Sequence, residues 1–143
     1  MRFWDSSAIV PLVASEGVSA SALELYRKDH EILVWMFTIT EVTSALCGKL
    51  RDGSLSREAF RRIRVELREL SGDWSEVTAV EPVCRRANRL LEIHPLSAAD
   101  ALQLGAALIA TADDPRGFSF VTYDRTLALA AEKEGFSVQD AQS

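Results

Sequence analysis

Four acidic residues follow predicted strands directly or lie in the first turns of the helices after them. Asp5 closes a short apolar segment at the start of the chain, and Asp124 follows the strand-like run of residues 118–122. Glu41 and Asp100 lie at the starts of two helical patterns. In open α/β sheets, ligands bind at the carboxyl ends of the strands. Carboxylate oxygens suit Mg²⁺ or Mn²⁺, and such ions act on phosphoryl groups.

Each acid also has a purely structural explanation. Thr38–Glu41 and Ser97–Asp100 both fit a capping box, in which the acid satisfies its own helix terminus, and Asp5 and Asp124 are suitable N-caps. Considered together, four carboxylates in one crevice repel one another and raise each other's pKa. A fold tolerates such repulsion mainly to hold a cation. The pattern therefore favours a metal site. Metal binding is the property that distinguishes this hypothesis from the one in which the four acids only cap helices.

The elements that must position these acids alternate along the chain. Strands are predicted at residues 2–5, 32–35, 77–80, 118–122 and 136–138, with helices between them. This alternation predicts a mainly parallel sheet of four to five strands with helices on both faces, which is a three-layer α/β/α sandwich. A length of 143 residues is that of one domain, so we expect a single domain over residues 1–143.

Composition excludes several classes of protein. The chain is 48% hydrophobic with only seven Gly and four Pro, which excludes disorder and collagen-like repeats. Two cysteines are too few for a disulfide framework or a zinc site. A net charge of −5 argues against a general polyanion binder. Apolar runs are too short for a membrane helix, and Asp5 interrupts the one that could be a signal peptide. We therefore expect no membrane association and a cytoplasmic location.

The segments around the four acids resemble the motifs of a known family. Residues 3–10, 38–46, 96–104 and 120–128 look like the four motifs of PIN-domain ribonucleases, in the same order and with similar spacing. The closest likeness is to the VapC-type toxins of bacterial toxin–antitoxin pairs. The resemblance covers essentially the whole chain. Gly105 and Trp4 depart from the usual family residues, and we interpret both as variations in packing.

This resemblance implies a fold, an activity and partners. The expected fold is PIN-like, and the expected activity is Mg²⁺- or Mn²⁺-dependent endonucleolytic cleavage of RNA. The expected partners are a second copy of the chain and a small antitoxin bound beside the site. By position in the motifs, the acidic set that holds metal and acts in catalysis is Asp5, Glu41, Asp100 and Asp124, supported by the hydroxyls of Ser7 and Thr122.

The proposed roles within this set follow from metal-ion chemistry. Asp5, Asp100 and Asp124 are expected to hold the ion, and Glu41 to bind a second ion or orient water. Two alternatives remain open: an RNA-processing nuclease without an antitoxin, and a non-catalytic PIN-like binding module in which the acids are only caps.

The helix predicted over residues 56–70 carries two stripes of side chains. The apolar stripe consists of Phe60, Ile63 and Leu67. The basic stripe consists of Arg57, Arg61, Arg64 and Arg68. On one interpretation the apolar stripe faces the core and the Arg stems cover its margin. On the other, the helix contacts RNA phosphates or a partner. An antitoxin would then pack an apolar segment on the first stripe and extend an Arg or Lys to the acids.

Overall fold

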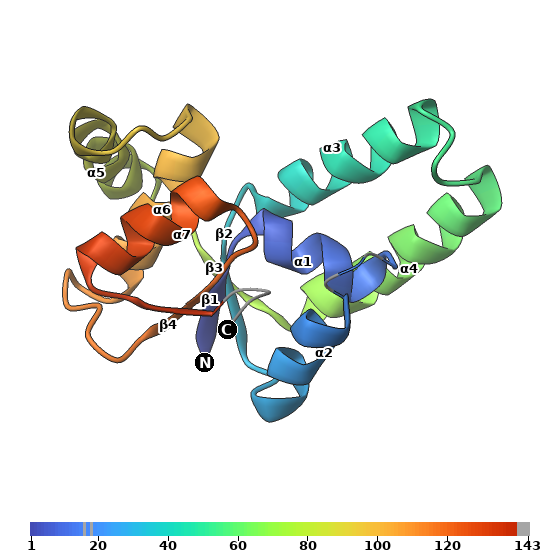
Figure 1. Ribbon diagram of the computed structural model, residues 1–143, viewed down its shortest axis with the longest axis horizontal. Helices are drawn as coiled ribbons and strands as arrows, with labels where there is room; N and C mark the ends of the chain where they lie inside the picture. The colour runs from blue at the N-terminus through green and yellow to red at the C-terminus, as the bar shows by residue number, and fades with distance from the viewer. Residues whose placement is uncertain (16, 18, 140–143) are drawn as a thin grey trace.

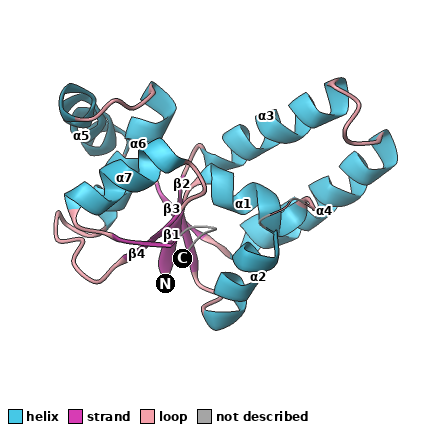
Figure 2. Ribbon diagram, viewed as in Figure 1, coloured by secondary structure: helices cyan, strands magenta, loops and turns pink. Residues whose placement is uncertain are grey.

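The structure is a computed structural model that describes residues 1–15, 17 and 19–139. In this part of the chain, five strands form one sheet with the order β3-β2-β1-β4-β5. The labelled strands lie together in the middle of the molecule, with helices around them (Figure 2). All neighbouring strands are parallel. Their bounds are β1 Arg2–Trp4, β2 Ile32–Trp35, β3 Ser75–Val77, β4 Ser119–Val121 and β5 Ser137–Gln139. The expected parallel α/β/α fold is confirmed.

Helices cover both faces of this sheet (Figure 1). One face is covered by α1 Ser6–Val13, α2 Ser19–Lys28, α3 Thr38–Arg51 and α4 Arg57–Asp73. The other face is covered by α5 Val80–Ile93, α6 Ala98–Ala110 and α7 Arg125–Glu134. Helices α3 and α4 lie side by side and extend to one side of the molecule (Figure 1).

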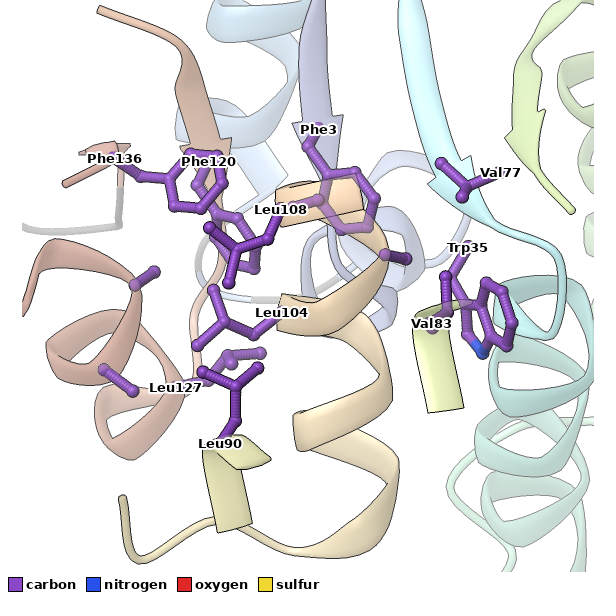
Figure 3. Packing of buried hydrophobic residues seen from close by; sticks show 14 of the residues in the cluster. Phe3, Trp35, Val77, Val83, Leu90, Leu104, Leu108, Phe120, Leu127 and Phe136 are labelled. Atoms are coloured by element: carbon purple, nitrogen blue, oxygen red, sulfur yellow. The ribbon is translucent and has the colours of Figure 1, made fainter. Parts of the chain in front are cut away.

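Alternation of side chains along the strands builds an apolar core on each face. Phe3 and Phe120 stack at 5.2 Å between ring centroids, and Leu104 and Leu108 of α6 pack in the same cluster (Figure 3). The next residues along the same strands face α1 to α4 and include Trp4 and Val121. Strands buried on both faces have continuous apolar sequences, and this is why such short segments could be predicted as strands.

Helices α5 and α6 pack closely, and Gly105 is the reason. A Cβ at Gly105 would lie 3.1 Å from the Val83 carbonyl oxygen and 3.3 Å from the Ala87 nitrogen. The absence of a side chain lets the two helix backbones approach each other, which fixes α6 and the acid at its start against the sheet.

The structure differs from the sequence expectations at two elements. Helix α1 was not predicted from the sequence, and it contains Pro11, a residue type that usually ends or kinks a helix. The third strand is Ser75–Val77 rather than residues 77–80, because Val80 already begins α5. Pro82 then lies in the first turn of α5, where its missing N–H leaves no bond unmade.

Within the described residues, no single helix is long and apolar enough to cross a membrane. Helices α5 and α6 pass the same length and composition test only as a pair bent by 119°, and buried core helices also pass it.

Candidate active site

The four acids lie at the carboxyl ends of three adjacent strands, and we call this region the acidic edge. Asp5 follows β1, and Asp124 lies beyond β4 at the start of α7. Glu41 lies in the first turn of α3 after β2, and Asp100 lies in the first turn of α6. Because β2, β1 and β4 are neighbours and parallel, the topology brings their ends together.

Asp5 is the most deeply buried of the four, with only 2% of its surface exposed. It occupies the N-cap position of α1. Its carboxylate accepts hydrogen bonds from the Ser7 hydroxyl and from the Thr122 hydroxyl, the latter at 2.6 Å. Burial raises the pKa of Asp5, the two hydroxyls and the Ser7 backbone N–H lower it, and the charge of Asp124 raises it further.

The two hydroxyls that contact Asp5 also connect the start of α1 to the segment after β4. Ser7 Oγ accepts a hydrogen bond from the Tyr123 backbone N–H at 2.9 Å, and Thr122 Oγ1 accepts one from the Asp124 N–H at 3.1 Å. Each hydroxyl therefore orients the Asp5 carboxylate and is itself held by a backbone N–H of the segment that follows β4.

Glu41 is half-buried and does not form the expected capping box. The N-cap of α3 is Phe37, and the Thr38 side chain is buried. The Glu41 carboxylate instead accepts a 2.7 Å hydrogen bond from Gln103 Nε2 on α6. Burial raises the pKa of Glu41 to about 7, with the charges of Asp5 and Asp100 adding to the shift and the Gln103 bond opposing it.

Asp100 and Asp124 retain some capping character. Ser97 is the N-cap of α6, and its hydroxyl accepts from the Asp100 backbone N–H at 3.2 Å. Burial, with the charges of Asp124 and Asp5, raises the pKa of Asp100 to about 6. Asp124 is a true N-cap, since its carboxylate accepts a 2.8 Å bond from the Leu127 N–H. The capping explanation therefore holds for Asp124 and fails for Glu41, whereas Asp5 interacts with two hydroxyls in addition to the Ser7 N–H of α1.

The acids share one electrostatic environment without forming a closed metal cage. Each pKa shift includes a contribution from at least one other acid of the edge. Among the described residues, however, no three or more His, Cys, Asp or Glu side chains stand together in a group that could hold a metal ion. The donors are all carboxylate oxygens, which is the chemistry Mg²⁺ and Mn²⁺ prefer. The donor set thus fits such an ion, with side-chain adjustment needed to enclose it.

Sequence reasoning did not assign a role to Gln103. It is fully buried, and its Nε2 also donates to Thr38 Oγ1 at 3.0 Å. The available signal was a polar side chain inside an Ala- and Leu-rich apolar helix, three residues after Asp100 and therefore on a neighbouring part of the same helix face.

Of the two interpretations of the apolar stripe on α4, burial favours the one in which the stripe faces the core. Phe60, Ile63 and Leu67 are buried in the core on the α1 to α4 face of the sheet, so they are not available to a partner. The basic stripe of α4 is exposed, as the Arg stems cover the margin of that core: Arg57, Arg61, Arg64 and Arg68. The Arg64 guanidinium lies 5.8 Å from the Phe60 ring centroid.

A comparison with known protein families identifies the family of this chain. A model of the PIN domain family matches residues 2–133. The chain belongs to the PIN domain family. PIN domains are generally metal-dependent nucleases. The family resemblance inferred from the four motifs is thereby confirmed.

Two solved structures share the PIN fold of this chain. PAE2754 from Pyrobaculum aerophilum is 18% identical with a TM-score of 0.68, and the match covers 99% of this chain and 89% of that one. FitAcB from Neisseria gonorrhoeae is 14% identical with a TM-score of 0.68, and the match covers 99% of both chains. At these identities the likeness concerns the fold. No curated protein matches the sequence.

Proposed function

We propose that this PIN-family chain is an Mg²⁺- or Mn²⁺-dependent endoribonuclease that hydrolyses RNA phosphodiester bonds as the toxin of a type II toxin–antitoxin pair. The observation that carries the proposal is the acidic edge itself. It contains a buried carboxylate, Asp5, and two partly buried ones, Glu41 and Asp100. Their pKa values are raised by burial and by the charges of other acids of the edge. Such repulsion opposes folding, and a bound cation offsets it.

The roles proposed for the acids follow from their surroundings. Asp5, Asp100 and Asp124 would hold the ion, which when bound supplies Lewis acidity at a phosphate oxygen. Ser7 and Thr122 keep the Asp5 carboxylate in one orientation through their hydroxyls. Glu41, with a pKa of about 7, is suited to accept a proton from attacking water near neutral pH. Its alternative role is to bind a second ion.

The test is RNA cleavage with and without divalent metal. Wild type should cleave single-stranded or loop RNA in Mg²⁺ or Mn²⁺ and not in chelator. Asp100→Asn should fold normally and lose roughly 100-fold or more, because the ion contributes several kcal/mol to the transition state. Glu92→Gln, which removes an exposed charge on α5, is the matched control and should leave cleavage unchanged. Full cleavage in chelator contradicts the metal-dependent mechanism.

The partner surface proposed for the antitoxin must lie elsewhere than the buried stripe of α4. A pocket of about 260 Å³ between α1, α2 and α4 offers an alternative. It is lined by apolar side chains, including Leu12, Leu23 and Tyr26, and by three acidic ones: Glu66, Glu69 and Asp73. A lining that combines apolar and acidic side chains fits an amphipathic segment that carries Arg or Lys.

Charge reversal tests this surface. Glu69→Lys with Asp73→Lys should weaken antitoxin binding and leave RNA cleavage intact, whereas reversal of Glu92 to Lys should change neither. Unaltered antitoxin affinity in the double variant contradicts the proposed surface.

The proposal also includes a homodimer in the cytoplasm, and light scattering on the purified chain tests the dimer.

A non-catalytic PIN-like module is the second candidate. Two observations favour it: Asp124 serves as a helix cap, and the described residues contain no group already arranged to hold a metal ion. If Mn²⁺ neither binds nor stabilises the wild-type chain, this candidate is selected over the toxin and over an RNA-processing nuclease without an antitoxin.

A further inference from the structure

A buried amide links the helices that carry Glu41 and Asp100. Gln103 is the one polar side chain among the buried residues of α6, a helix that the structure describes throughout. Its Nε2 donates to Glu41 Oε2 at 2.7 Å and to Thr38 Oγ1 at 3.0 Å, both on α3. Its Oε1 is buried and has no hydrogen-bond partner.

The orientation of this amide follows from what its neighbours can do. An ionised carboxylate only accepts hydrogen bonds, whereas the Thr38 hydroxyl can donate or accept. The NH₂ group therefore faces the ionised form of Glu41, and this leaves Oε1 buried without a partner. An unpaired buried acceptor is unfavourable for stability. An unbranched apolar side chain of the same length would avoid that cost and would lose the bonds to Thr38 and Glu41, so these two contacts with α3 are what Gln103 contributes.

We infer that Gln103 is a positioning residue, which ties α3 to α6 and holds the Glu41 carboxylate toward the other acids of the edge. Asp100 lies three residues before Gln103, so both occupy neighbouring positions on one face of α6. A bond from Gln103 to Glu41 thereby sets the separation of the two helix starts that carry Glu41 and Asp100. For its metal-binding consequence the inference rests on the proposed function, with Glu41 in the role of an ion ligand.

The substitution that tests the inference is Gln103→Met, which keeps the length of the side chain and removes both polar ends. Metal-free, its melting temperature should stay within about 3 °C of that of wild type, because loss of the unpaired Oε1 offsets loss of the bonds to Thr38 and Glu41. Its Mn²⁺ affinity, measured by calorimetry, should fall by about 10- to 100-fold, the usual loss when a group that orients a metal ligand is removed. The rise in melting temperature on adding Mn²⁺ should shrink accordingly.

Thr38→Val is the matched control. It removes the other acceptor of Gln103 Nε2 and leaves the bond to Glu41 in place. Its Mn²⁺ affinity should stay within a factor of about three of wild type, well inside the 10- to 100-fold loss expected for Gln103→Met. An equal loss in both variants would show that general packing between α3 and α6, and not orientation of Glu41, is what matters.

Repeating the measurement in a Glu41→Gln variant shows whether Gln103 acts through Glu41. If Gln103 acts through Glu41, adding Gln103→Met to Glu41→Gln should cause no further loss of Mn²⁺ affinity. A further 10-fold loss overturns the inference, as does a lower metal-free melting temperature with undiminished Mn²⁺ binding. Mn²⁺ binding by a wild type that does not cleave RNA contradicts the proposed function alone. Absence of Mn²⁺ binding by wild type overturns both.

Discussion

The acidic edge and helix α4 distribute polar and apolar side chains in opposite ways. On α4, apolar side chains such as Ile63 and Leu67 are buried, and the arginines are exposed. At the acidic edge, Asp5, Thr38 and Gln103 are buried, while Phe37 beside them is 47% exposed. Helix α4 has the arrangement that stability alone favours. The acidic edge does not, and this difference is the physical reason to look for function at the edge.

The largest effect that tests this comparison is expected in the core beneath α4. Leu67→Asp should destabilise the chain by more than about 4 kcal/mol, because it buries an unpaired charge. Arg68→Gln, one residue further along, is exposed and should change the free energy of unfolding by less than about 0.5 kcal/mol. Urea unfolding followed by circular dichroism measures both. A folded Leu67→Asp variant of near wild-type stability would mean that α4 does not pack as described.

The opposite result is expected at the acidic edge, where charge removal should stabilise the metal-free chain. The pKa of Glu41 is about 7 instead of 4.5, and that of Asp100 is about 6 instead of 3.8. The folded state therefore binds protons more tightly than the unfolded chain. This contribution to stability is complete below about pH 4 and is lost as the pH rises through 6 to 7.

The expected loss between about pH 4.5 and 7 is on the order of 1–2 kcal/mol, smaller than a full conversion of the shifts, because both carboxyls are partly exposed and screened by solvent. Melting temperatures in chelator across this range measure it. Glu41→Gln should flatten the decline relative to wild type, and the size of this difference gives the share of the decline that belongs to Glu41. A parallel decline in both proteins would mean that Glu41 keeps its ordinary pKa.

Much of the fold and part of the site follow from local sequence patterns. Strand ends at Asp5 and Asp124 were predictable because apolar runs of strand length precede them, and parallel topology then places both at one edge. Helix α1 was not predicted, since Pro11 is tolerated there only because of packing against other helices. The role of Gln103 was not predictable either, because it depends on contact with Glu41, 62 residues earlier in the chain.

A smaller effect on stability is expected at Asp124, the acid of the edge that also caps a helix. Asp124→Ala should cost about 1 kcal/mol in the metal-free chain, because it removes the cap on the Leu127 N–H. Asp124→Asn keeps an equally good capping side chain and removes a charge that acts on Asp5 and Asp100, so it should be neutral or stabilising. Thermal unfolding in chelator compares the two variants. Equal stability of both would mean that the cap contributes nothing.

The smallest effect on stability is expected for single substitutions on the basic stripe of α4. Such substitutions also test what the exposed arginines do. Arg61→Gln should leave the free energy of unfolding within about 0.5 kcal/mol of wild type, because the side chain is exposed. If Arg61 contacts an RNA phosphate, the variant should bind single-stranded RNA more weakly for all sequences tested, and the slope of log affinity against log salt should decrease by about 0.7. Fluorescence anisotropy across a salt series in chelator measures the slope without cleavage. An unchanged slope would mean that the stripe covers the core margin and does not contact RNA, so that α4 differs from the acidic edge in function as well as in packing.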